Sequence, residues 1–443
     1  MRWRIFTALL GAILMANMPA RADEDARAQA RLFLASISPP GAKISFASAE
    51  PSGDAITVRD VVAHAETPGG EEIIQRIGLL RLQGLKPLPS GLFRVEKLSV
   101  ENIRIDAAGV QTTKPGGIQI EKISASDIDG ARLGDIAATA IEISTFAIGS
   151  TYAIRIAGAN LKNVNAQSLT RALVRANDAP EAGRREDAAL HALLNDVAYD
   201  ALHLHGLSLR RDKTSLITVA EISSTPDGAY APFPASGKFS IRQADIDLLD
   251  PMAAMLYRQF GQDRLQFSLE SQHSYRTPAS HGWDISLKLS PDAVLAGKCA
   301  AQNLNGFSPA LIRQNQAASG SAGILRSCDL NFTGTGFVNR WLAQDGARDG
   351  LSLEEARAKY LAGSLLVSLD PAAASDPLAQ QLSGAAQIFL TQPARVNIRI
   401  EPQGGLKFPD GAATLAMLFQ GRPEQRREAM QKLGLSIAAQ PLD

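Results

Sequence analysis

Aromatic side chains are scarce in this sequence, and neither sign of charge is in excess. Aromatic residues make up 5% of the 443 residues, and 45 Lys and Arg are balanced by 45 Asp and Glu. Proteins that bind single-stranded nucleic acid combine a positive groove with stacking aromatic rings. An excess of one sign is what attracts nucleic acid or acidic lipid over a distance. The composition therefore predicts a protein that does not bind nucleic acid.

Common catalytic motifs are also missing. The sequence contains no Gly-x-Ser-x-Gly elbow, no Walker loop and no His-Glu-x-x-His pair. The stretch Gly334–Asn339 is close to a dinucleotide-binding loop but lacks its third glycine, so we interpret it as a turn before a helix. We predict no catalytic residue, no cofactor and no enzymatic activity. A hydrolase with an unrecognised site is the less favoured alternative.

Cysteine is rare, and the two that occur are Cys299 and Cys328. No Cys-x-x-Cys is present and no His lies within ten residues of either cysteine, which disfavours a metal site or a redox pair. An even count in an exported chain is most simply one disulfide. Closing a loop of about 30 residues would contribute roughly 3–4 kcal/mol in the chain-entropy model.

Long apolar runs are absent after the N-terminal segment, which has the features of a signal peptide. Arg2 and Arg4 precede the apolar run Ile5–Met15, and Ala20–Ala22 provides an A-x-A cleavage site. The run is shorter than the ~20 residues of a spanning helix, so an uncleaved anchor is the weaker alternative. We predict cleavage after Ala22, export to a Gram-negative periplasm, and a mature chain without a transmembrane segment.

The feature around which the sequence is organised is a short phrase that occurs three times. Each copy has an aliphatic residue, Ser, three variable positions and Ile, and Glu-Lys-x-Ser is identical at 96–99 and 121–124. The copies are 25 and 20 residues apart, which suits a repeated strand unit. The predicted core positions of the repeat are Leu98, Ile103, Ile123, Ile128, Ile143 and Ile148.

These repeats predict strands, because β-branched residues dominate them and Gly and Pro bound them. The alternation of apolar residues changes parity within a copy: Leu98 and Val100 share one parity, while Ile103 and Ile105 share the other. Either each copy contains a bulge near Glu101 and Asn102, or two short strands meet there at a bend. Both explanations give a curved antiparallel sheet with one apolar face.

The remaining helix and strand patterns of the sequence predict the α+β fold class. We expect an extended, curved antiparallel β-sheet built from repeated strand units, with helices on one face and at the ends. The C-terminal third alternates helices with strands, including a strand at 364–369 and a helix at 423–433 that Gly434 ends. We predict a signal peptide (1–22), a helix and repeat-containing β region (23–165), a helical pair (166–201), a second β region with the disulfide (202–335) and a C-terminal α+β region (336–443).

Two groups of side chains are candidates for metal binding. His203 and His205 project from one face of a strand, and His191 or Asp200 could complete a site. The alternation instead places Leu204 toward the core and both histidines in solvent, which is the interpretation we adopt.

The second group consists of two Asp-x-Asp pairs. Asp127 with Asp129, and Asp245 with Asp247, could hold a divalent cation or share acid–base work. Each pair ends a strand pattern, however, where Asp is common in turns. We therefore predict no metal site.

A family resemblance completes the sequence picture. The stretches VEKLSVENIRI (95–105), IEKISASDIDG (120–130) and 249–275 resemble repeated units of YdgA-like and AsmA-like envelope proteins of Gram-negative bacteria. That resemblance implies a long, curved antiparallel sheet whose apolar concave face holds lipid or packs on another envelope component. AsmA-like proteins usually keep an N-terminal membrane anchor, whereas the signal here is predicted to be cleaved.

The patterns and the resemblance together predict an exported, non-enzymatic β-rich protein. We expect it to bind an apolar ligand such as lipid, or an envelope partner, through its sheet. The alternative is a structural or assembly factor of the cell envelope without a ligand.

Overall fold

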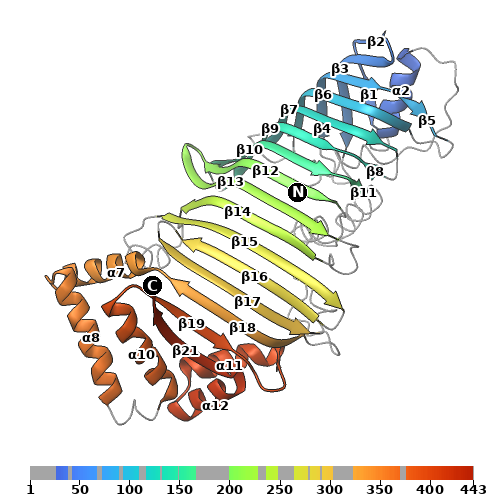
Figure 1. The fold of residues 1–443 in the computed structure, drawn as a ribbon. Coiled ribbons are helices and arrows are strands. Elements are labelled where there is room, and N and C mark those ends of the chain that lie inside the picture. Colours follow the sequence, from blue (N-terminus) through green and yellow to red (C-terminus); the bar gives the residue numbers. More distant parts are fainter. Residues whose placement is uncertain are drawn as a thin grey trace. The chain divides into compact units, whose positions relative to one another are not determined.

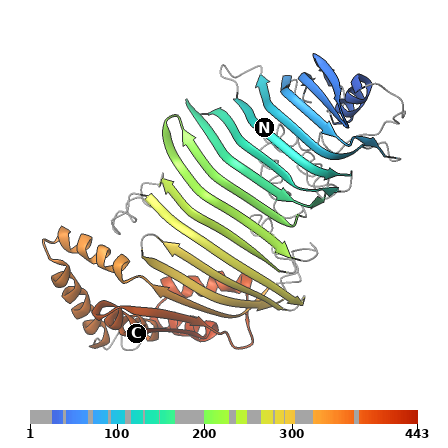
Figure 2. The same ribbon diagram turned by 45° about the horizontal axis from the view of Figure 1, so that its top comes forward.

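The computed structural model divides the chain into two compact units, Met1–Phe233 and Pro234–Asp443. The described residues are 26–37, 42–66, 72–88, 93–108, 116–129, 132–147, 149–165, 199–227, 236–247, 264–277, 280–289, 292–302, 323–369 and 376–442. Each unit is built on an antiparallel sheet of twisted strands, and most of the described helices belong to the second unit (Figures 1 and 2). The predicted class, antiparallel β-structure with helices, is confirmed.

The first unit is a sheet whose strands are mostly neighbours in sequence. β1 and β2 lie along one edge of β3, and the order continues β4–β6–β7–β9–β10–β12–β13, with every neighbouring pair antiparallel. The elements are α2 (Ala26–Ile37), β1 (Lys43–Ser45), β2 (Ser48–Ser52), β3 (Ala55–Glu66), β4 (Glu72–Gln83), β5 (Lys86–Pro87), β6 (Phe93–Ala108), β7 (Gly116–Ile128), β8 (Arg132–Leu133), β9 (Ile136–Ala147), β10 (Ser150–Lys162), β11 (Val164–Asn165), β12 (Ala201–Arg211) and β13 (Thr214–Asp227).

The three copies of the sequence repeat occupy β6, β7 and β9, which pair in that order. Their predicted core positions contribute to one hydrophobic core, and those within the described residues are Leu98, Ile103, Ile123, Ile128 and Ile143. Ile148 lies outside the described residues. The repeat therefore corresponds to consecutive strands of one sheet that pack the same face.

The irregular alternation within a repeat has its origin at Asn102. Leu98 and Val100 are buried before it, and Ile103 and Ile105 are buried after it. Asn102 has a left-handed backbone with φ of 57°, while the register with β4 is the same on both sides of it. Because no residue is inserted, the structure shows a bend between two strand halves and not a bulge.

Other strands of the first unit bend at the same level. Asp60, Ala140 and Gly206 also have positive φ, of 53°, 48° and 63°. Each of these residues, like Asn102, directly precedes an apolar residue that lies opposite another apolar residue on the neighbouring strand. We call this row of paired apolar residues the bend row. It crosses eight strands and consists of Val61, Ile77, Ile103, Ile120, Ile141, Ile156, Leu207 and Val219. The shared bend keeps apolar side chains on one face along the whole of each strand.

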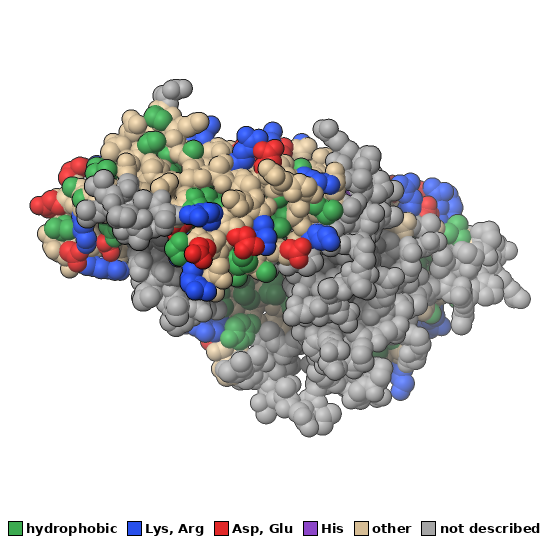
Figure 3. Space-filling model, turned by 90° about the horizontal axis from the view of Figure 1, so that it is seen from below, with side chains coloured by type: hydrophobic (Ala, Val, Ile, Leu, Met, Phe, Trp, Pro, Cys, Tyr) green, Lys and Arg blue, Asp and Glu red, His purple; other side chains and the backbone are tan. Residues whose placement is uncertain are grey.

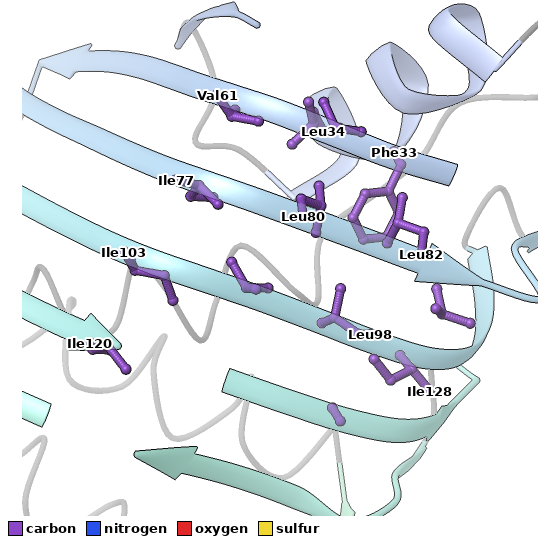
Figure 4. Packing of buried hydrophobic residues seen from close by; sticks show 14 of the residues in the cluster. Phe33, Leu34, Val61, Ile77, Leu80, Leu82, Leu98, Ile103, Ile120 and Ile128 are labelled. Carbon is purple, nitrogen blue, oxygen red and sulfur yellow. The ribbon is translucent and has the colours of Figure 1, made fainter. Parts of the chain in front are cut away.

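The core of the first unit lies between this face and α2. Phe33 and Leu34 of α2 are buried against the sheet, and the ring of Phe33 meets Phe93 edge-on at a centroid distance of 6.0 Å. Leu80 and Leu82 of β4 are fully buried beneath them (Figure 4). Full burial of such side chains is worth about 1.5–3 kcal/mol each, so this end of the sheet has a filled core.

The opposite face of the first sheet carries cross-strand charges. Glu101 lies directly opposite Lys122 and forms an ion pair of 3.0 Å. Arg76 and Arg104 also lie opposite each other, and Asp106 bridges them with N–O distances of 2.6 and 2.9 Å. Opposite charges facing each other stabilise a sheet, whereas like charges destabilise it, so Asp106 relieves the repulsion of this arginine pair.

The second unit is an antiparallel sheet with helices at its C-terminal part. The pairing order is β14–β15–β16–β17–β18–β19–β21, and β20 pairs with β18. The elements are β14 (Ser236–Asp247), β15 (Arg264–Thr277), β16 (Ser280–Leu289), β17 (Ala293–Gln302), β18 (Ile324–Thr333), α7 (Thr335–Arg348), α8 (Leu353–Leu369), α10 (Pro377–Thr391), β19 (Ala394–Ile400), β20 (Leu406–Lys407), α11 (Phe408–Gln420), α12 (Pro423–Leu433) and β21 (Leu435–Pro441).

One detail differs from the sequence prediction. The predicted strand at 364–369 is the C-terminal part of α8, because a short apolar run does not by itself distinguish strand from buried helix. Contact with α10 favours the helix, since Ser383 Oγ donates to Ser364 O at 2.5 Å. β12, at the start of the predicted second β region, pairs with β10 and belongs to the first unit. Most of the predicted helical pair, 166–198, lies outside the described residues.

Candidate functional site

The strongest candidate surface is one face of the second sheet. Apolar and polar residues alternate along Leu265–Leu269 of β15 and Ile285–Leu289 of β16, so the apolar side chains of each stretch share a face. One register row runs through the middle of this face. We call it the central row, and it consists of Ile241, Leu269, Leu287, Leu295, Phe332 and Val396.

Helices cover the C-terminal end of this row. The ring of Phe332 contacts Phe337 of α7 at a centroid distance of 6.4 Å and Phe389 of α10 at 5.9 Å. Leu378 of α10 belongs to a buried cluster that also includes the partly buried Ile398 of β19. β18 and β19 therefore pack their apolar face on protein.

At the other end of the face, the described residues include no large apolar side chain that is buried. Among the described residues of β14–β17, those whose side chain is fully buried and apolar are Ala244, Ala293 and Ala301. Ile241, Leu269, Leu287 and Leu295 are half-buried. Phe239 and Ile285, which flank Ser271 in the next register row, are 37% and 39% exposed. We refer to Phe239, Ile285 and the first four members of the central row as the open apolar face.

The first sheet gives a direct comparison. In its bend row, Val61, Ile77, Ile103, Ile120 and Ile141 of β3–β9 and Val219 of β13 are buried, while Ile156 and Leu207 are half-buried. Burying an apolar side chain is favourable by roughly 25 cal/mol for each Å² removed from water. The side chains of the open apolar face are not fully buried by the described strands of their own sheet. An apolar ligand bound there would therefore bury more apolar surface than at any other part of this sheet face.

The polar faces carry both signs of charge in close pairs. On β14, Asp245 and Asp247 both pair with Arg264 of β15, the latter at 3.6 Å, and Gln266 Nε2 donates to Asp245 Oδ2 at 3.1 Å. In Figure 3, Lys and Arg side chains likewise lie beside Asp and Glu on the face shown. The second Asp-x-Asp pair is thus engaged by an arginine.

The other candidate metal ligands do not converge. His203 Nε2 lies 3.3 Å from Glu221 Oε1 on the polar face, and its ring is 5.8 Å from that of His205. Asp200 accepts a hydrogen bond from Asn163 Nδ2 at 2.6 Å, and His191 lies outside the described residues. No group of three or more His, Cys, Asp or Glu side chains in the described part of the chain is placed to hold a metal ion.

The first Asp-x-Asp pair has local backbone roles. Asp129 Oδ1 accepts a hydrogen bond from the backbone N–H of Arg132 at 2.8 Å, which is a common turn contact. Asp127 has a left-handed backbone with φ of 52°, a conformation that Asp tolerates better than most residues. These roles agree with the turn interpretation of the pair.

The disulfide belongs to the apolar face. Cys299 and Cys328 are directly opposed on β17 and β18 and are joined by a disulfide, as the cysteine count predicts. Trp283 of β16 lies opposite Cys299 in the same row. Its neighbour His281, which no sequence pattern singles out, is buried and stacks on the Trp283 ring at 5.8 Å with an interplanar angle of 12°.

The environment of His281 predicts a pH-dependent stability. Burial, with a smaller contribution from His273, lowers the pKa of His281 from 6.5 to about 4. A base whose pKa is lower in the folded state stabilises the protein above pH 6.5 and loses that stability as pH falls toward 4. The full shift corresponds to about 3 kcal/mol.

This dependence is measured by urea unfolding between pH 7 and pH 4. We expect His281→Phe to flatten the decline in this window. Equal slopes for the wild type and the His281 variant would contradict the assignment.

Comparison with known proteins gives one match. Residues 296–440, about a third of the chain and including β18 to β20 with most of β17 and β21, match a family model described as "Uncharacterized protein". No similar curated protein and no similar solved structure was found. Among the described residues, none of the helices combines the length and apolar character required to cross a membrane.

Proposed function

We propose that this protein is an exported, non-enzymatic carrier or receptor for an apolar ligand, and that the open apolar face of the second unit holds the ligand. A lipid acyl chain is the ligand class that best suits the face. The observation that carries the proposal is a contrast in burial between two groups of strands. The bend row is buried in β3–β9 of the first sheet, whereas the residues of the open apolar face in β14–β17 are half-buried or exposed.

The dimensions of the face support an acyl chain. The central row from Ile241 to Leu295 spans three strand spacings, about 14 Å at 4.8 Å per spacing. The row contains only aliphatic side chains over this length. Apolar contact without directional polar groups suits a hydrocarbon chain, which binds through burial alone.

The environment of the candidate acids and bases supports a role without catalysis. The carboxylates of Asp245 and Asp247 share Arg264, and the histidine–glutamate contact of the first unit is on the polar surface. The disulfide supports an oxidising compartment. We therefore also propose cleavage after Ala22 and function in the periplasm.

The proposal is tested with two adjacent substitutions on opposite faces of β16. Ile285→Lys places a charge in the open apolar face. Ser286→Lys places the same charge on the polar face, opposite Glu270. Native mass spectrometry of protein purified from the periplasm should show bound lipid in the wild type and in Ser286→Lys. We expect at least tenfold less lipid in Ile285→Lys, because an ammonium group is costly in an apolar contact.

Two results would contradict the proposal. One is wild-type protein without any apolar ligand when it is purified without detergent. The other is equal retention of lipid by the two variants. Unfolding by urea serves as the control, because both substituted side chains lie in the same strand and both variants must be shown to be folded.

A further inference from the structure

We infer that the open apolar face binds a single-chain amphiphile in one direction, with its polar head beside His273 and Trp283 and its hydrocarbon tail across the central row. We call the end of the face that carries His273 and Trp283 the polar end. The inference rests on the proposed function, because it concerns the same face. It adds the chemical class of the ligand, which is one hydrocarbon chain with a head that accepts hydrogen bonds.

The first observation is a change from apolar to polar residues along β15. The residues of this strand that share the face of the central row are, in order, Leu265, Phe267, Leu269, Ser271 and His273. Leu265 and His273 are eight residues apart, about 27 Å at 3.4 Å per residue. Acyl chains in one leaflet of a bilayer span about 15 Å, half of the hydrocarbon core. A head beside His273 therefore leaves enough length for a whole tail on the apolar part of the face.

The second observation is that the neighbouring strands show the same change. The register row at the apolar end consists of Ala244, Phe267, Leu289 and Ala293. The register row at the polar end consists of Gly237, His273, Trp283 and Cys299. The first row has no polar side chain, whereas the second contains an indole N–H and the two ring nitrogens of an imidazole. The change in polarity is therefore a property of the face and not of one strand.

The third observation concerns the polar groups that a ligand would cover. Ser271 and Trp283 are half-buried, so part of each side chain contacts water. A hydrocarbon tail over the polar end would displace this water from the hydroxyl and the indole N–H, which costs free energy where no other partner replaces it. A head with a hydroxyl, ester or carboxylate oxygen can accept hydrogen bonds from both groups. This difference favours one direction of the ligand over the reverse.

Trp283 is held in place at the polar end. Its ring stacks on His281 at a centroid distance of 5.8 Å, and His281 is 5% exposed. His281 is the next residue of β16 on the same face, so Trp283 is the last residue of this strand that a ligand on the open apolar face can reach. The head of the ligand therefore stops at Trp283.

The direction of the ligand is tested with Trp283 as a local probe. The sequence contains Trp3, Trp283 and Trp341, and Trp3 lies in the segment proposed to be cleaved. Trp341→Phe thus leaves Trp283 as the only indole of the mature chain. The probes are stearic acid and its glycerol monoester, each with bromine atoms either near the head or at the end of the tail, because bromine quenches tryptophan fluorescence only at close contact. We expect the head-labelled probes to quench Trp283 at least threefold more than the tail-labelled probes.

Three variants control this measurement. Trp283→Phe leaves Trp341, which packs on Tyr360 at 4.6 Å, and neither label should quench it. In the Trp341→Phe background, Ser271→Leu/His273→Leu makes the polar end apolar and should bring the ratio of head to tail quenching to about one. Gln272→Leu is the matched control, because Gln272 is exposed on the opposite face of β15; it should keep the ratio. Urea unfolding verifies that the variants fold, and Ser271→Leu alone should lower the ratio if the double variant does not.

Binding of the same probes is measured separately by equilibrium dialysis. The probe that binds more tightly identifies the source of the head, a fatty acid for the acid or an acylglycerol for the ester. Bound probes that quench Trp283 equally from head and tail, or more strongly from the tail, would overturn this inference and leave the proposed function standing. Equal ratios in the double variant and in Gln272→Leu would also overturn it. Failure of every probe to bind would overturn both the inference and the proposed function.

Discussion

Replacing Asp376 with alanine is expected to lower the free energy of unfolding of the second unit by about 3 kcal/mol. Asp376 is the N-cap of α10: its Oδ1 accepts hydrogen bonds from the backbone N–H groups of Leu378 and Ala379 at 3.0 and 3.4 Å. Its Oδ2 accepts from Arg426 of α12 at 2.7 Å. The buried Asp376 carboxylate thus accepts the hydrogen bonds of backbone N–H groups in the first turn of α10, and it also holds α12 through Arg426.

The size of this effect follows from its two parts. Loss of an N-cap costs about 0.5–2 kcal/mol, and breaking a buried ion pair costs about 3–5 kcal/mol when the remaining charge stays buried. The Arg426 side chain is 34% exposed and Arg426 Nε also donates to Gly421 O, so the charge that remains is partly solvated and loss of the pair costs less than that range, about 2 kcal/mol. With about 1 kcal/mol for the cap, the expected total is about 3 kcal/mol.

Asp376→Asn is the informative comparison in the same urea titration. Asparagine is also a good N-cap, so this variant keeps the helix start and loses only the charge. We expect it to lose about half as much stability as the alanine variant. If Asp376→Ala were as stable as the wild type, the buried pair would have no structural role.

The second large effect is expected at the shared bend of the first sheet. Gly206 has φ of 63°, and a Cβ atom there would lie 2.7 Å from the Cβ of Ala157 on the neighbouring strand. Left-handed backbone costs about 1–2 kcal/mol for a residue with a Cβ, and overpacking costs about 1–3 kcal/mol more. Gly206→Val should therefore destabilise the first unit by roughly 3 kcal/mol.

A matched control separates backbone strain from the steric clash. Gly53 also has positive φ, of 65°, but a Cβ atom added there would have no other atom within 4 Å. Gly53→Val should cost only the backbone strain. Adding Ala157→Gly to the Gly206→Val variant should restore the stability lost to the clash. Equal midpoints of urea unfolding for Gly206→Val and Gly53→Val would show that β10 and β12 do not approach as closely as the structure shows.

Sequence patterns predicted the elements whose signals are local. The end of α12 at Gly434 follows from the left-handed conformation that glycine readily adopts, with φ of 55°. The 364–369 segment was predicted wrongly because its apolar run is too short to have a period. Its helical state depends on packing against α10, which the sequence does not encode locally.

The candidate sites were less accessible from the sequence. An apolar sheet face was predicted in general, but the exposure of Phe239 and Ile285 depends on which strands the C-terminal helices cover. The buried position of His281 likewise results from stacking on Trp283 and pairing with β17. These are properties of long-range contacts, so no local pattern of residues reports them.

The alternation of left-handed residues limits how such a sheet can grow or shrink in evolution. In the first unit such a residue precedes the bend row in β3, β6, β9 and β12, while the described residues of the intervening β4, β7, β10 and β13 include none at that level. The repeating structural unit of this sheet is consequently a pair of strands, although the sequence phrase recurs strand by strand. If a hairpin of two strands were gained or lost, strands with and without a left-handed residue would still alternate. If one strand were gained or lost, two strands of the same kind would become neighbours. Related proteins with longer or shorter sheets should therefore differ by an even number of strands.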